Sequence, residues 1–266
     1  MVSPLSDDEQ EQPGPERRGL MRELLDRIGR YEYGVLASLL AIVLAVLGFI
    51  WIADKVVDGA TLRFDDWAIR ALRRPENPAI PIGPRWLAEV GRDMTTLGGV
   101  AFISLLTLTI AGYLWLRRLY GTLTLLLTSV VGGLIVSSVL KAVFARPRPD
   151  LVPHLSIVST SSFPSGHAMM SAVVFLTIGT LLGRVVPEFR LKAYFLIIAI
   201  VLTLLVGVSR VYMGVHYPTD VLAGWAAGLA WALGCGLIGR AFHGRMRFDR
   251  KTGLQNDGVT SMSSKP

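Results

Sequence analysis

Long apolar runs constrain this chain more than any other feature of its sequence. Each run has about 20 residues, enough for a helix rising 1.5 Å per residue to cross the ~30 Å hydrocarbon core of a bilayer. Because lipid offers no partner to an open backbone, we expect each run to be helical. The runs lie approximately at residues 33–53, 96–116, 119–140, 167–186, 191–208 and 221–239. They predict an all-α fold, a polytopic membrane bundle of six transmembrane helices with a long outer loop between the first two.

Composition supports one membrane domain between two polar ends. Of the 266 residues, 52% are hydrophobic and 18% are charged, which is more apolar than a typical soluble domain. We expect the membrane domain at 33–240, with a polar segment 1–32 before it and a polar tail 241–266 after it. Small residues inside the runs, such as Gly224 and Gly228, predict close approach between helices.

The long outer loop contains a second helical pattern. Residues 62–74 carry apolar side chains at helical spacing, among them Phe64 and Trp67. We expect a helix that either lies along the membrane interface or packs over the outer mouth of the bundle.

Cationic residues flank the runs in a pattern that sets the orientation of the bundle. They cluster at 17–30, 117–118, 184–192 and 240–251. With six spans these clusters all fall on one side, which the positive-inside rule makes cytoplasmic. The outer connections should then be poor in cations, but they contain Lys141, Arg146, Arg148 and Arg210. We interpret this departure as anion binding on the outer face. The basic residues form no stripe, so we expect no binding of nucleic acid.

The first anion-binding stretch runs from Lys141 to Arg148, at the end of the third apolar run. Alone, a lysine at a helix end most simply reaches toward the lipid surface. Pro149 follows Arg148 and favours a stiff, extended chain. Held near one point, the two cations would grip a phosphate, which the guanidinium would bind through two hydrogen bonds.

The second stretch, FPSGH, opens the fourth run. Ser165 is a suitable N-cap, Gly166 leaves room for a ligand near the backbone, and the first amides of a helix lack partners. Plain capping explains such a stretch, although a helix N-terminus is also an anion site. His167 lies in the first turn, where it can hold a proton beside an anion and serve as a general acid.

The third stretch, SRVYMGVHYPTD, contains Arg210, His216 and Asp220. Pro218 suits the first turn of the sixth helix, which places Asp220 within reach of the imidazole four residues earlier. A carboxylate on one ring nitrogen fixes the tautomer and leaves the other nitrogen free to attack. By itself such a pair is equally a structural contact or part of a metal site.

Together the three stretches favour phosphoryl transfer through a phosphohistidine, because charges near a bilayer are costly and usually functional. His216 would attack phosphorus in line, and His167 would protonate the leaving oxygen and then help to activate water. Cations and backbone amides would hold the phosphate oxygens, at Lys141, Arg148, Arg210, Ser165 and Gly166. Since fixed cations supply the charge, we predict no metal and no other cofactor.

These stretches resemble the signatures of the type 2 phosphatidic acid phosphatase (PAP2) superfamily, the lipid phosphate phosphatases. The signatures K-x6-RP, PSGH and SR-x5-H-x3-D read here as 141–149, 164–167 and 209–220. The resemblance implies a six-span helical core, a site at the outer membrane interface and metal-independent dephosphorylation of lipid phosphates. It also implies His216 as nucleophile, Asp220 as its partner and His167 as acid, with the same phosphate ligands. Arg146 and His154 lie outside the signatures, and we expect both to be loop residues.

The resemblance leaves the substrate open among phosphatidate, phosphatidylglycerophosphate and undecaprenyl diphosphate, each entering sideways from the bilayer. The alternative is a non-catalytic lipid-phosphate binding or transport protein on the same scaffold. Such a binder has no use for His216, Asp220 and His167 together. A soluble-type vanadate haloperoxidase shares the anion site but not the six spans.

The predicted location is the bacterial inner membrane, with both termini in the cytoplasm and the site facing the periplasm. The membrane and its lipid phosphate are the partners that we expect, without an obligate protein partner.

Overall fold

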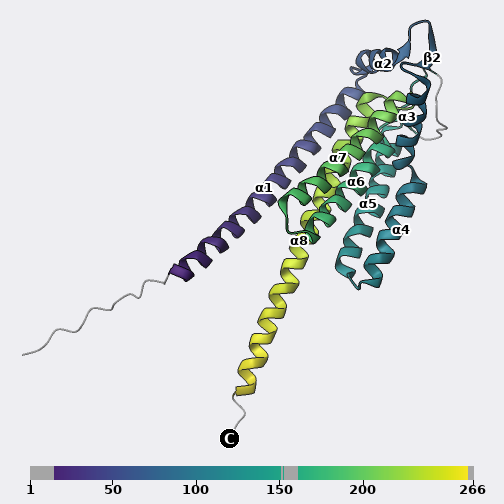
Figure 1. Ribbon diagram of the computed structural model, residues 1–266. Coiled ribbons are helices and arrows are strands. Elements are labelled where there is room, and N and C mark those ends of the chain that lie inside the picture. Colours follow the sequence, from purple (N-terminus) through teal and green to yellow (C-terminus); the bar gives the residue numbers. More distant parts are fainter. Residues whose placement is uncertain (1–14, 151, 153–160, 263–266) are drawn as a thin grey trace, which may run out of the picture. The chain divides into compact units, whose positions relative to one another are not determined.

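The computed structural model describes residues 15–150, 152 and 161–262, and of these it gives only the backbone for 15–32 and 242–262. Residues 1–40 and 41–266 form separate compact units, and the second contains the bundle described below. The described helices are α1 (Pro15–Val57), α2 (Leu62–Ala71), α3 (Arg85–Leu97), α4 (Val100–Leu116), α5 (Tyr120–Phe144), α6 (Gly166–Val185), α7 (Phe189–Tyr212) and α8 (Pro218–Met262). Strands β1 (Arg73–Arg74) and β2 (Asn77–Pro81) form a short antiparallel hairpin after α2 (Figure 1).

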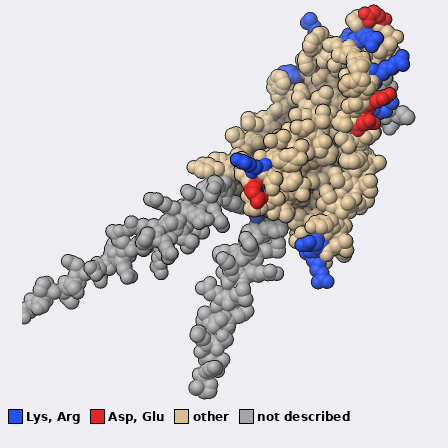
Figure 2. Space-filling view, viewed as in Figure 1, with Lys and Arg blue, Asp and Glu red and all other residues tan. Residues whose placement is uncertain are grey.

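The helical elements confirm the predicted all-α, multi-pass membrane fold. Within the described residues, five helices are long and apolar enough to cross a membrane. The α3–α4 pair passes the same test together and is bent by 47°, so the bundle has up to six spans if that pair is one span. Charged side chains gather toward the ends of the face shown in Figure 2 and leave an uncharged surface between them. That distribution suits a body whose middle lies in hydrocarbon.

Helix α6 is the centre of the bundle and packs against α5, α7 and α8. Of its most apolar stretch 61% is buried, compared with 22% in α5 and in α7. The close approach predicted at Gly224 and Gly228 is confirmed on the α8 side of this packing. A Cβ at Gly224 would lie 2.6 Å from the carbonyl oxygen of Ser165, and one at Gly228 would lie 2.5 Å from that of Met169. Hydrogen in place of a side chain therefore lets the two backbones touch.

Helix α2 forms within the predicted segment 62–74, but its apolar stripe is not the face that packs. Phe64 and Trp67 are exposed, whereas Asp65 and Ile69 are fully buried. The buried pair is spaced four residues apart, so both side chains lie on one face of the helix. Ile69 joins a small apolar cluster with Val152, with Val211 of α7 and with Tyr217 of the α7–α8 connection. The helix is thus packed on the bundle and leaves its large aromatic side chains outward.

The first and last helices continue beyond the apolar spans that they contain, Tyr33–Val57 and Pro218–Ala241. Helix α1 begins at Pro15, and α8 continues to Met262, so both helices extend into the segments predicted as polar ends. The polar sequence of those segments is compatible with helix, because helix propensity does not require apolar side chains.

Candidate active site

The three signature stretches meet at one end of the bundle, where α5 and α7 end and α6 and α8 begin. The backbone N–H of Ser165 donates to the carbonyl oxygen of Asp220 at 2.9 Å, which joins the first turns of α6 and α8. Gly166 lies against Lys141: a Cβ there would be 3.1 Å from the lysine Cε. Residues 25 and 55 positions apart are therefore held together by the antiparallel order of neighbouring helices.

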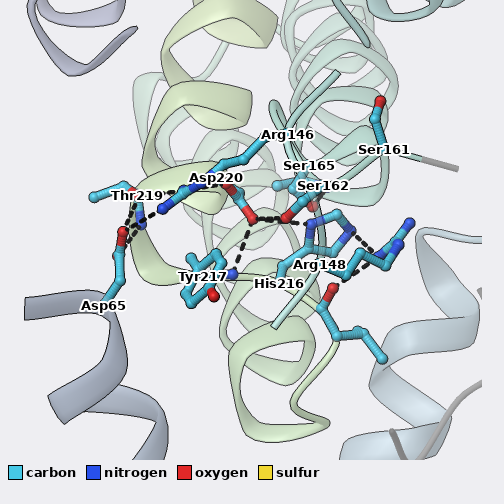
Figure 3. A network of polar contacts seen from close by, with 12 residues as sticks. Asp65, Arg146, Arg148, Ser161, Ser162, Ser165, His216, Tyr217, Thr219 and Asp220 are labelled. Atoms are coloured by element: carbon cyan, nitrogen blue, oxygen red, sulfur yellow. Dashed lines mark hydrogen bonds and ion pairs between the residues drawn. The ribbon is translucent and has the colours of Figure 1, made fainter. Parts of the chain in front are cut away.

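His216 and Asp220 form the buried centre of this end (Figure 3). They are 1% and 0% exposed. The imidazole Nδ1 is 3.4 Å from Asp220 Oδ2, which also accepts the backbone N–H of Tyr217 at 2.9 Å. The hydroxyl of Ser162 donates to the same oxygen. One carboxylate oxygen thus receives several donors, and this fixes the direction from which it faces the imidazole.

Arg148 contacts the opposite nitrogen of the same ring. Its Nη1 lies 3.1 Å from His216 Nε2 and also donates to the carbonyl oxygen of Val215 at 2.7 Å. A guanidinium has donors only, so Nε2 must accept and the ring proton must be on Nδ1, toward Asp220. This geometry selects the tautomer whose Nε2 lone pair points toward the cations.

Burial controls the charge of these side chains. Loss of solvent lowers the pKa of His216 to about 4, although the Asp220 carboxylate acts in the opposite direction. Burial also lowers the pKa of Arg148, again opposed by Asp220. His216 is therefore neutral at physiological pH, and its Nε2 is available as a nucleophile or hydrogen-bond acceptor.

The start of α6 provides backbone donors beside further cations. Ser165 is the N-cap, and its hydroxyl oxygen accepts the N–H of Ala168 at 3.5 Å. The Lys141 ammonium donates to the carbonyl oxygen of Ser161 at 2.7 Å. Arg210 is 2% exposed, and its Nε has no hydrogen-bond partner in the part of the chain that the structure describes. A buried, unsatisfied guanidinium N–H beside a helix N-terminus is suited to an anion.

His167 lies one residue inside α6, close to the break between α3 and α4. Its Nε2 is 3.9 Å from the place that a Cβ would take at Gly99. The charged groups of Arg210, Lys141 and Arg148 are near enough to act electrostatically on this ring. The side chain therefore belongs to the same polar end of the bundle as His216.

Arg146 lies in the loop after α5, as expected, but its side chain is buried in the site rather than exposed. The side chain is 8% exposed and forms ion pairs with Asp65 of α2 at 2.9 Å and with Asp220 at 2.7 Å. The sequence feature that could have identified Arg146 is its position among cations in the outer connections, where the positive-inside rule predicts few. Asp65 and Ser162 were missed as well, because neither belongs to a recognisable motif. His154 lies outside the described residues.

Comparisons with known proteins agree with this arrangement. The profile of the PAP2 superfamily matches residues 122–242. Phosphatidylglycerophosphatase B of Bacillus subtilis (strain 168) is 41% identical over 153 residues, which are 57% of this chain and 74% of that protein. Undecaprenyl-diphosphatase of Sulfolobus acidocaldarius is 33% identical over 108 residues, or 39% of this chain and 48% of that protein.

A solved structure extends the likeness from sequence to fold. The transmembrane PAP2-type phosphatidylglycerolphosphate phosphatase from Bacillus subtilis superposes with a TM-score of 0.66 at 33% sequence identity. The superposition covers 77% of this chain and 96% of that one. The chain therefore belongs to the PAP2 superfamily.

Proposed function

We propose that this protein is a membrane phosphatase that removes phosphate from a lipid phosphate or diphosphate through a phosphohistidine at His216. The observation that carries the proposal is the buried His216 ring, bound by Asp220 on Nδ1 and by a cation on Nε2. A nucleophile activated in this way, next to a helix N-terminus and several cations, is suited to attack on phosphorus.

The first step forms a bond between His216 Nε2 and phosphorus and breaks the bond from phosphorus to the lipid or diphosphate oxygen. In the structure an N–H of Arg148 covers that nitrogen. A phosphate oxygen that accepts this N–H in place of the ring would free the Nε2 lone pair for attack. His167 gives its proton to the leaving oxygen, so that the leaving group departs as an alcohol or a monophosphate.

The second step returns the protein to its starting state. Neutral His167 takes a proton from water, whose oxygen attacks phosphorus while the bond from phosphorus to Nε2 breaks. Inorganic phosphate leaves, and His216 regains its neutral ring with the proton still on Nδ1, held by Asp220. Lys141, Arg148 and Arg210, with the amides near Ser165 and Gly166, would hold the equatorial oxygens throughout.

Fixed cations perform in this mechanism the role that a divalent metal has in other phosphatases. Arg210 is buried and Arg148 is half-buried, and a low-dielectric environment strengthens their attraction for phosphate oxygens. We accordingly propose that neither step needs a metal ion or another cofactor.

The substrate is proposed from the membrane setting and from the relatives. These include a phosphatidylglycerophosphatase B, undecaprenyl-diphosphatases and lipid A 1-phosphatases, all named for phosphorylated lipids. Phosphatidate, phosphatidylglycerophosphate and undecaprenyl diphosphate share the group that the site would bind. A site at the ends of membrane helices lets the headgroup reach His216 while the tails remain in the bilayer.

A substitution of the nucleophile tests the proposal. Purified wild type in detergent, with EDTA present throughout, should release phosphate from at least one of phosphatidate, phosphatidylglycerophosphate and undecaprenyl diphosphate. His216→Ala should release none, while its thermal unfolding in detergent shows that it is folded. Ile238→Ala, an exposed change on α8, is the matched control and should keep wild-type turnover.

Three results would contradict different parts of the proposal. Full turnover by His216→Ala excludes this nucleophile. A strict requirement for added Mg²⁺ excludes the metal-free mechanism. Tight binding of all three lipids with no phosphate release by wild type supports the non-catalytic binding protein instead.

A further inference from the structure

The Asp220 carboxylate has a second set of contacts, on the side away from the His216 ring. Its Oδ1 accepts Nη1 of Arg146 at 2.7 Å, whereas the imidazole is on Oδ2. The two oxygens therefore have different partners, and Figure 3 shows Arg146 and His216 on different sides of Asp220. A carboxylate gripped at both oxygens has little freedom to rotate.

Arg146 is in turn held by α2. Its Nη2 donates to Asp65 Oδ2 at 2.9 Å, and its Nη1 also donates to the Thr219 hydroxyl at 3.0 Å. The guanidinium lies 4.2 Å from the centre of the Tyr217 ring, a cation–π distance. Planar geometry lets one guanidinium make these contacts at once, which a lysine ammonium cannot reproduce.

Asp65 completes the chain of contacts by binding the start of α8. It accepts the backbone N–H of Thr219 at 3.2 Å and the Thr219 hydroxyl at 2.7 Å. An aspartate in that place satisfies a free N–H of the first helical turn and complements its dipole. The same carboxylate also balances the charge of Arg146, so the cation does not rest on Asp220 alone.

We propose that Asp65, Arg146 and Thr219 are positioning residues that hold the Asp220 carboxylate in line with His216, and that α2 is thereby a working part of the active site. The proposal rests on the proposed phosphohistidine at His216. These residues do not touch the phosphate. They act through Asp220, whose direction decides whether the His216 Nε2 lone pair faces phosphorus.

The burial of Asp65, Arg146 and Thr219 and the ion pairs of Arg146 favour a positioning role over an incidental surface contact. All three side chains are at most 8% exposed. Burial opposes the charge of Arg146, but Asp220 and Asp65 outweigh it and raise its pKa. An ion pair buried in this way is costly to break and is kept rigid by its geometry.

Single-turnover kinetics separate positioning from a merely structural role. We would mix excess enzyme in detergent micelles with ³²P-phosphatidate, quench in alkali, and follow protein-bound phosphate with time. Because the enzyme is in excess and saturating, the rate constant measures the chemical step in the folded protein. Size-exclusion chromatography of the same preparation measures the fraction of folded protein separately. A role limited to holding α2 on the bundle lowers only that folded fraction.

The test variants are Asp65→Asn, Arg146→Lys and the double variant. Asp65→Asn keeps the shape and an acceptor for Thr219, and it leaves Arg146 paired with Asp220, so it is the variant least disruptive to folding. Each single variant should lower the rate constant roughly 10- to 100-fold, the range expected for a lost hydrogen bond to a charged group. The double variant should be no slower than the slower single variant, because both changes break the same contact.

Neighbouring residues on α2 provide the matched controls, Asp66→Asn and Arg63→Lys, which should keep wild-type rate constants. Rate constants equal to wild type in Asp65→Asn and Arg146→Lys, with only the folded fraction reduced, would overturn the proposal. Independent, multiplying losses in the double variant would overturn it as well. Activity in His216→Ala would instead remove the proposed function itself, so the two failures are distinguishable.

Discussion

The charge on His216 is decided by three neighbours and by burial. Asp220 lies on Nδ1 and favours the protonated ring, whereas Arg148 and Arg210 oppose it. Burial is the largest effect and also opposes the proton, so the neutral form prevails. A neutral ring is the form that the proposed phosphohistidine mechanism requires, and burial of the site favours that form.

The pH dependence of activity should show that the His216 ring is neutral. Because the pKa of His216 is lowered to about 4, the neutral ring persists well below the ordinary value of 6.5. We expect kcat/KM to stay high as the pH falls through 6.5 and to decline only as it approaches 4. Measured on the wild type with a soluble short-chain phosphatidate, an acidic limb centred at 6.5 would be the opposite result.

Asp220→Asn should leave the fold intact but remove the group that fixes the ring proton on Nδ1. In a triad with the same arrangement this change costs about 10,000-fold in turnover. We expect a loss of that order in phosphate release, with little change in KM. Turnover within tenfold of wild type would show that the carboxylate does not orient the ring.

Packing between helices α6 and α8 affects the geometry of the site, because both helices begin there. Gly228 lies where the two backbones touch, with no room for a Cβ beside Met169 and Ala172. Any added atom there must move α8 away from α6. Since Ser165 and Asp220 are joined across the same contact, such a movement reaches the catalytic end.

Gly228→Ala should therefore destabilise the bundle by about 1–3 kcal/mol, the usual cost of overpacking. Thermal unfolding in detergent measures the change. Gly234→Ala on the same helix is the matched control, because nothing lies within 4 Å of its new Cβ. It should leave the melting temperature unchanged or slightly raised, since alanine is the better helix former. Equal melting temperatures for the two variants would show that the close contact is not needed.

The arrangement of the whole molecule puts α2, the β1–β2 hairpin and the signature stretches at one end of the bundle (Figure 1). The turn between α4 and α5 lies at the other end and carries Arg117 and Arg118. By the positive-inside rule we predict that this turn lies in the cytoplasm and that the site lies on the opposite side of the membrane.

Cysteine labelling in spheroplasts tests this orientation, and the single native Cys235 makes the background simple. In a Cys235→Ser background, Glu76→Cys in the hairpin should react with a membrane-impermeant maleimide. Arg118→Cys in the α4–α5 turn should react only after the membrane is permeabilised, since it would lie inside. The reverse labelling pattern would place the site in the cytoplasm.

The sequence by itself determined the membrane bundle and the motif residues of the site. Hydropathy is a local property, so runs of apolar residues predict helices regardless of what packs against them. The candidate roles of His216, Asp220 and the flanking cations could also be predicted, because these residues lie at short spacings beside helix ends. Gly224 and Gly228 likewise predicted a close contact between helices, because glycine has no side chain to separate them.

Only the tertiary structure decided which further residues join that site. The contact between Asp65 and Arg146 spans 81 positions, and no local pattern encodes it. Nor did the apolar stripe of α2 indicate its packed face, because Phe64 and Trp67 are exposed whereas Asp65 and Ile69 are buried. An ion pair such as that between Asp65 and Arg146 forms only where segments far apart in the sequence meet. Packing of the bundle around α6 decides where they meet, and the identity of the two residues does not.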